Sequence, residues 1–96
     1  MYMVITYDVS TESKEGRRRL RRIAKTCRNF GQRVQFSVFE CKLDKTNWIK
    51  LRAQLLEEFN DKEDSLRFYT LCEDDLGKVE HHGQKKPLDL DSPLIV

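Results

Sequence analysis

The stretch from Met3 to Ser10, MVITYDVS, decides how the chain begins to fold, because it has the pattern of an apolar β-strand. The strand ends on a single carboxylate, Asp8. Burying an unpaired carboxylate costs several kcal/mol, so Asp8 is either a cap at the strand end or part of a functional site. The segment GRRRLRRIAK, residues 16–25, follows closely and brings a dense group of arginines near this carboxylate.

Composition favours one soluble globular domain. The chain has 96 residues, of which 39% are hydrophobic and 35% are charged. No apolar run approaches the roughly 18 residues that a membrane helix needs, and the N-terminus lacks the pattern of a signal sequence. We therefore expect a cytoplasmic protein with no membrane partner. The three cysteines, Cys27, Cys41 and Cys72, lie in apolar-patterned stretches and are interpreted as reduced core residues.

Positive charge is concentrated in the N-terminal half, although the formal net charge is only +2. Between residues 14 and 33, Glu15 is the only acidic residue among many lysines and arginines. Arginine donates paired hydrogen bonds to phosphate, so this segment indicates contact with a nucleic-acid backbone. The alternative interpretation is a solvated helix face. The predicted phosphate-binding residues are Arg17, Arg18, Arg19, Arg22 and Arg33.

The remaining pattern predicts strands and helices in the order βαββαβ. A helix with an apolar face follows the first strand and ends near Gly31, and residues 33–43 read as a second strand with a phase change that a bulge would explain. A second helix begins near Asp44 or Thr46. Residues 65–73 and 78–82 read as two further strands joined by a turn. This order predicts a ferredoxin-like α+β sandwich, an antiparallel sheet with both helices on one face.

Residues 1–82 form the predicted domain, and residues 83–96 form a polar hinge and an apolar tail. Helices on one face of a sheet leave the other face uncovered, while the strands carry apolar residues in both phases. We therefore expect a homodimer in which the sheets pack against each other. In the tail, Leu88 and Leu90 alternate with Asp89 and Asp91, so it is predicted to add a strand to the partner's sheet.

A two-fold dimer would also give Asp8 a chemical role. Two copies of this carboxylate facing each other near the axis would bind a hard divalent cation, Mg²⁺ or Mn²⁺, that activates water against a phosphodiester. Asp8 would then be both the metal ligand and the catalytic residue. The competing interpretation is a turn in which Asp8 acts with Ser10 as a cap.

Three segments together resemble a known family: YDVS at residues 7–10, GRRRLRRIAK at 16–25 and FGQRVQFSVFEC at 30–41. They are similar to the small adaptation protein of CRISPR systems, the second of the two universal spacer-acquisition proteins. The similarity extends from Met1 to about Cys72, and the tail LDLDSPLIV also resembles members of one CRISPR subtype.

The resemblance implies a ferredoxin-like homodimer that acts as a metal-dependent endonuclease on RNA or double-stranded DNA. It also implies that the dimer bridges the CRISPR integrase subunits and holds the captured duplex. By matching motif positions, Asp8 would be the metal ligand and Tyr7 its supporting neighbour. Arg33 and Phe39 would match residues that are important in relatives, and Ser37 lies within the same motif. In some relatives the carboxylate is dispensable for spacer acquisition, so the alternative is a non-catalytic, structural DNA-binding subunit.

Overall fold

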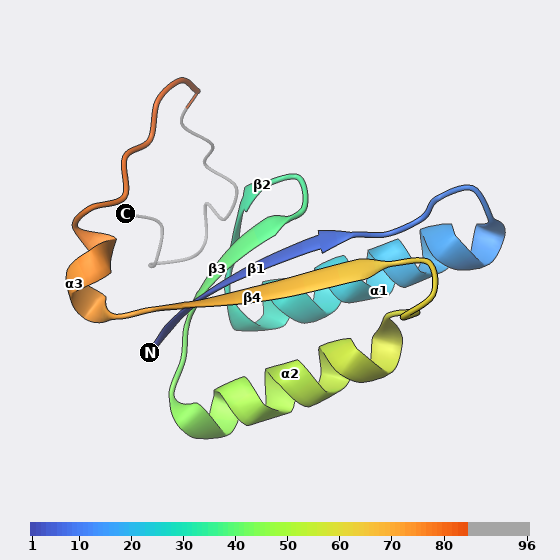
Figure 1. Ribbon diagram of the computed structural model, residues 1–96, viewed down its shortest axis with the longest axis horizontal. Helices are drawn as coiled ribbons and strands as arrows, with labels where there is room; N and C mark the ends of the chain where they lie inside the picture. Colours follow the sequence, from blue (N-terminus) through green and yellow to red (C-terminus); the bar gives the residue numbers. More distant parts are fainter. Residues whose placement is uncertain (85–96) are drawn as a thin grey trace.

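The computed structural model describes residues 1–84, which form an antiparallel four-stranded sheet and two long helices (Figure 1). The strands lie in the order β2-β3-β1-β4, and both long helices cover the same face of the sheet. The predicted βαββαβ order and ferredoxin-like α+β class are confirmed. The elements are β1 (Tyr2–Asp8), α1 (Lys14–Phe30), β2 (Gln32–Gln35), β3 (Val38–Lys42), α2 (Lys45–Glu58), β4 (Ser65–Leu71) and the single-turn α3 (Glu73–Leu76).

Helix α1 is capped by a hydrogen bond at each end. The Ser13 side chain accepts a hydrogen bond from the Gly16 amide at 2.9 Å, which satisfies one of the free amides of the first turn. At the other end, the Gly31 amide donates to the Cys27 carbonyl at 2.9 Å. Gly31 also packs so closely on β3 that a Cβ atom there would overlap the Glu40 carbonyl oxygen. This close approach fixes α1 against the sheet.

Strand β1 runs through the centre of the sheet and alternates between two environments. Met3, Ile5 and Tyr7 are buried beneath the helices, where Phe39, Cys41, Leu51 and Leu55 complete much of the core. Burial of each large apolar side chain stabilises the fold by about 1.5–3 kcal/mol before entropy is counted. Tyr2, Val4, Thr6 and Asp8 alternate with the buried residues and lie on the opposite face, which neither long helix covers.

The predicted single strand at residues 33–43 is wrong, because these residues form two strands joined by a tight hairpin. Gln35 pairs with Val38, so Phe36 and Ser37 form a two-residue turn, and the register shifts between Arg33 and Gln35. The phase change in the apolar pattern of residues 33–43 therefore has two causes, a bulge in β2 and the reversal of chain direction at the turn. No non-glycine residue of the described chain has a positive φ, so the turn lacks the backbone geometry that usually places Asn or Gly there.

The predicted strand at residues 78–82 is also wrong. After β4 the chain forms α3 instead, and the described residues 79–82 have no regular secondary structure. The Asp75 carboxylate accepts hydrogen bonds from the amide and the thiol of Cys72, which closes this turn. β3 and β4 thus take the places of the third and fourth strands in the βαββαβ order.

Two of the three predicted core cysteines are in the core. Cys27 and Cys41 are buried, and burial raises the pKa of each thiol to about 12, so both stay protonated at neutral pH. Cys72 is exposed, which corrects the prediction for this residue. Within residues 1–84, no helix is long and apolar enough to cross a membrane. The predicted tail strand lies outside the described residues.

Candidate functional site

Asp8 is the last residue of β1 and is exposed on the face of the sheet that the helices leave uncovered. It pairs in register with Ser65 at the start of β4. The residues described here contain no group of three or more His, Cys, Asp or Glu side chains that would hold a metal ion. Carboxylate oxygens are the ligands that Mg²⁺ prefers, and the predicted pair requires a second copy of Asp8 from another chain.

A groove of about 690 Å³ lies beside the end of β1, between helix α1 and the β2–β3 turn. Four cations line it: Arg21, Lys25, Arg28 and Arg33. The apolar part of its surface comes from Val9, Leu20, Ala24 and Phe36, and Tyr7, Asp8 and Ser37 also line it. The fold thus brings the end of the apolar strand and the basic helix to one site.

Besides Asp8, three residues that the sequence singled out line this groove, namely Tyr7, Arg33 and Ser37, and the buried Phe39 packs against two of them. The Arg33 guanidinium carbon lies 5.2 Å from the centre of the Phe39 ring, within reach of a cation–π contact. The Phe39 ring stacks on Tyr7 with their centres 6.1 Å apart. The Tyr7 amide donates to the Ser37 carbonyl at 3.1 Å, which ties the hairpin turn to the end of β1. Tyr7 and Phe39 lie on the helix side of the sheet, whereas Asp8 lies on the other.

Two polar atoms at the groove are buried without a hydrogen-bond partner in the described part of the chain. They are the hydroxyl of Tyr7 and Nε of Arg33. Burial raises the pKa of Tyr7. The neighbouring Arg33 lowers this pKa by a smaller amount, and no hydrogen bond of good geometry joins the two side chains. At neutral pH the Tyr7 hydroxyl is therefore protonated and able both to donate and to accept.

The structure separates the predicted phosphate-binding arginines into different environments. Arg17, Arg18 and Arg22 are exposed on α1, and Arg33 is half-buried in the groove. The prediction overlooked Arg21, Lys25 and Arg28, which are exposed and lie along one side of α1. Their spacing of four and three residues was the signal that identifies them, because residues so spaced are neighbours on a helix.

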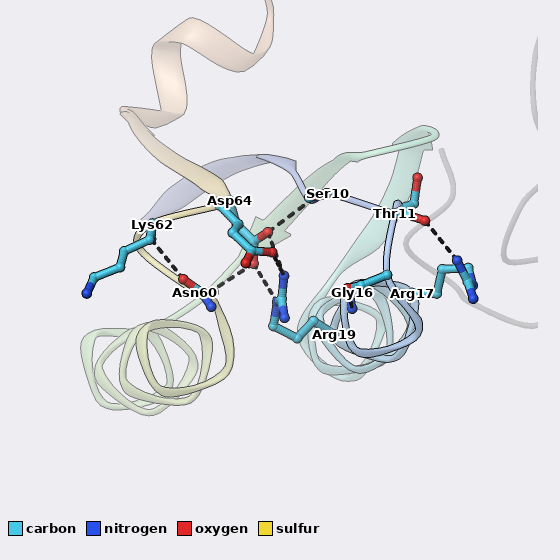
Figure 2. Close-up of polar contacts among 10 residues, drawn as sticks. Ser10, Thr11, Gly16, Arg17, Arg19, Asn60, Lys62 and Asp64 are labelled. Atoms are coloured by element: carbon cyan, nitrogen blue, oxygen red, sulfur yellow. Dashed lines mark hydrogen bonds and ion pairs between the residues drawn. The ribbon is translucent and has the colours of Figure 1, made fainter.

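Arg19 has a structural partner instead. Its Nε donates to the Asp64 carboxylate at 2.8 Å, and a second guanidinium nitrogen contacts Glu63 and Asp64, each at 3.2 Å. Asp64 also accepts from the amides of Ser10 and Asn60, so it joins three segments of the chain (Figure 2). We therefore leave Arg19 out of the phosphate-binding group proposed below.

Together the fold and the site define a class: a small ferredoxin-like protein with a basic helix and an exposed carboxylate at the end of its central strand. The family described as CRISPR associated protein Cas2 matches residues 1–79. The chain belongs to this family. Its members are CRISPR adaptation proteins, so the expectation drawn from the sequence resemblance is confirmed.

The relatives match over nearly the whole chain. A protein of Chlorobaculum tepidum, named CRISPR-associated endoribonuclease Cas2, is 60% identical over 96 residues, which are all of both chains. A protein of Halalkalibacterium halodurans, named CRISPR-associated endonuclease Cas2, is 50% identical over 95 residues, or 99% of each chain. The crystal structure of Streptococcus pyogenes Cas2 at pH 6.5 is 43% identical, with a TM-score of 0.77 over 86% of this chain and 100% of that one.

Proposed function

We propose that this protein is a CRISPR-associated nuclease that hydrolyses phosphodiester bonds of RNA or double-stranded DNA as a homodimer. The observation that carries the proposal is the position of Asp8, which is exposed at the end of β1 and lines the same groove as four cations. The names of the similar proteins support nuclease activity, since one is an endoribonuclease and another an endonuclease.

The dimer would form through the uncovered face of the sheet, which would bring Asp8 of each protomer toward the two-fold axis. These two carboxylates would hold Mg²⁺ or Mn²⁺, and the bound ion would supply an activated water and neutralise charge on the phosphate. The exposed arginines Arg17, Arg18 and Arg22 would bind the phosphates of the strand. They would position the backbone without reading the base sequence.

A second candidate is a structural DNA-binding subunit that bridges the CRISPR integrase without cleaving DNA. The observation that favours this alternative is that residues 1–84 contain no group of three or more His, Cys, Asp or Glu side chains that could hold a metal ion. The same basic helix would serve both roles. The two candidates differ in one respect that is easily measured: only the nuclease requires a divalent cation and the charge of Asp8.

The test uses the purified full-length chain with labelled double-stranded DNA and single-stranded RNA, in Mg²⁺, in Mn²⁺ or in chelator. We expect cleavage with metal, none with chelator, and a loss of at least 100-fold in Asp8→Asn, because the amide keeps the shape but removes the charge that holds the cation. Asp61→Asn, an exposed aspartate in the loop after α2, is the matched control and should cleave normally.

Cleavage by Asp8→Asn at the rate of the unchanged chain would reject the catalytic role of Asp8. Binding of duplex DNA without any cleavage, by a properly folded dimer, would favour the structural subunit. Comparing the two labelled substrates in one experiment also determines whether RNA or DNA is preferred, which the names of the relatives leave open.

A further inference from the structure

The groove beside α1 has chemistry that phosphate binding alone does not explain. Its interior is apolar, with Val9, Leu20 and Ala24 among its lining residues. Phe36 in the β2–β3 turn also lines it, although 88% of this residue is exposed to solvent. The volume of about 690 Å³ falls within the roughly 300–1,000 Å³ typical of small-molecule sites. A phosphate group needs no apolar surface, so the groove suits a ligand with a flat apolar part.

The cations of the groove would favour a ligand that carries negative charge. Arg21, Lys25 and Arg28 form one row along α1, and Arg33 approaches from β2. Three of them are exposed, so they remain available to an incoming anion. Asp8 is the only acidic residue that lines the groove within the described part of the chain. An anion with an aromatic part would therefore match both kinds of lining.

The unpartnered polar atoms show where such a ligand would make hydrogen bonds. Tyr7 is only 5% exposed, and its hydroxyl and Nε of Arg33 have no hydrogen-bond partner among residues 1–84. Buried polar atoms are normally satisfied, and each exception calls for a partner. The Tyr7 hydroxyl both donates and accepts, whereas Nε of Arg33 donates. Together they match the mixed donors and acceptors on the edge of a nucleobase.

We propose that the groove binds one unpaired nucleotide of a nucleic-acid strand. The base enters the apolar part, where the exposed Phe36 ring provides a stacking surface. The Tyr7 hydroxyl and Nε of Arg33 are enclosed in this structure, so the side chains over them shift when the base enters and the two groups then bond to its edge. The row on α1 binds its phosphate. The inference rests on the proposed binding of nucleic acid, but it requires neither cleavage nor a metal ion.

Calorimetric titration of the full-length chain in chelator tests this site apart from catalysis. The four nucleoside 5′-monophosphates, ribose 5-phosphate and inorganic phosphate are the ligands. We expect saturable binding of at least one mononucleotide, and binding of ribose 5-phosphate at least tenfold weaker because it lacks the base. Equal affinities for the mononucleotides and ribose 5-phosphate would mean that the groove is a simple anion site. The absence of saturable mononucleotide binding would mean that there is no site. Either result overturns the proposal.

Tyr7→Phe tests the hydrogen bond, with Tyr2→Phe on the same strand as the matched control. The loss of one hydrogen bond should weaken mononucleotide binding about five- to tenfold. The free variant should melt at the same temperature as the unchanged chain or higher, since an unsatisfied buried hydroxyl has been removed. A purely structural Tyr7 predicts the reverse, a lower melting temperature with unchanged affinity, and that result would overturn the proposal.

Arg33→Lys provides a second variant that keeps the charge but changes the donor geometry, with the exposed Arg52→Lys on α2 as its control. We expect weaker binding of mononucleotides and little change toward inorganic phosphate. The same titrations are repeated with a chain ending at Lys86. Binding that appears only in this shorter chain would mean that the protein's own C-terminal segment fills the groove, which would contradict the proposal.

Binding of duplex DNA, measured on the same preparations, separates this inference from the proposed function. Normal duplex binding without mononucleotide binding would overturn the groove site alone. A protein that binds neither duplex DNA nor mononucleotides would count against nucleic-acid binding in general.

Discussion

At the scale of single residues, Asp64 shows how one carboxylate joins distant parts of this fold. Its side chain is 0% exposed, and it accepts hydrogen bonds from the Arg19 side chain and from the amides of Ser10 and Asn60. Although burial alone would raise the pKa of Asp64, these donors stabilise its charged form, and the net effect is a pKa below the ordinary value of 3.8. The carboxylate is therefore ionised throughout the neutral range.

This shift leads to a prediction about stability and pH. Because the pKa of Asp64 is lower in the folded chain than in the unfolded chain, its contribution is complete above the ordinary value of 3.8 and is lost as the pH falls through the folded value. Asp64→Asn should lower the free energy of unfolding by roughly 2 kcal/mol at pH 7 and remove this acid-dependent component. Urea unfolding at several pH values and one protein concentration provides the measurement.

The exposed Asp61→Asn is the control and should change neither the stability nor its pH dependence. An Asp64→Asn protein that unfolds like the unchanged chain at pH 7 would show that the network adds little.

The role of Arg19 illustrates which residues sequence reasoning could not place. Arg17, Arg18, Arg19 and Arg22 look alike in the sequence, and helical periodicity correctly placed most of them on an exposed face. The ion pair of Arg19 depends on Asp64, 45 residues away, which only the tertiary fold brings within reach. In contrast, the exposed position of Asp8 followed from the alternation of its own strand.

At the scale of elements, helix α1 combines structural and binding roles on different sides. Its buried side, with Ile23, Ala24 and Cys27, packs on the sheet, while the exposed side carries many cations. The spacing of apolar residues along the helix was enough to predict which side of α1 is buried and which is exposed. The β2–β3 hairpin was not predictable, since its two-residue turn contains Phe36 and Ser37 where Gly, Asn or Asp usually mark a reversal.

The exposed cations of α1 lead to a prediction about salt dependence. Replacing Arg17, Arg18 and Arg22 with Ala should weaken duplex binding and reduce the slope of log affinity against log salt by about 0.9 for each phosphate that the variant no longer neutralises. Fluorescence anisotropy at several salt concentrations measures both quantities. The matched control replaces three exposed cations of α2, Lys45, Lys50 and Arg52, with Ala.

Both triple variants lose the same net charge, so an equal effect would indicate a general electrostatic attraction. A larger effect for α1 would support this helix as the binding surface. An unchanged slope in the α1 variant would contradict the proposed role of its arginines.

At the scale of the whole molecule, helices cover one face of the sheet, and no helix of residues 1–84 covers the other, which we call the open face (Figure 1). The open face contains Tyr2, Val4 and Thr6 on β1, and Arg67 and Tyr69 alternate with the helix-facing residues of β4. Tyr69 is 44% exposed, and the guanidinium carbon of Arg67 lies 5.6 Å from the centre of its ring. A second copy of the chain would bury this mixed apolar and polar face.

Tyr69→Glu tests whether the open face is the dimer interface. This change removes the Tyr69 ring from the face and buries a carboxylate in its place, which is costly even with Arg67 beside it, so we expect the dimer dissociation constant to rise at least tenfold. Ile49→Glu makes the same kind of change at an exposed apolar residue of α2 and should leave the constant unchanged. Sedimentation equilibrium measures both variants. An unchanged constant for Tyr69→Glu would place the interface elsewhere.

The edge of the sheet supports a further prediction for the assembly. β4 is an edge strand in the described chain, pairing with β1 on one side only, so its outer backbone groups are available to another strand. The predicted tail strand from Leu88 onward, with its alternating leucines and aspartates, would add there across the dimer. A chain ending at Lys86 should therefore form a weaker dimer, because each buried leucine or isoleucine contributes roughly 1.5 kcal/mol before ordering entropy is subtracted.

Sedimentation equilibrium compares this shorter chain with the full-length protein. As a second test variant, Leu88 and Leu90 are replaced with Asp in the full-length chain, which keeps the length but removes the apolar side of the tail. We expect both changes to weaken association, because the tail needs its leucines as well as its backbone to add a strand. If the shorter chain keeps the dissociation constant of the full-length protein, the open face alone holds the dimer and the tail contributes nothing to it.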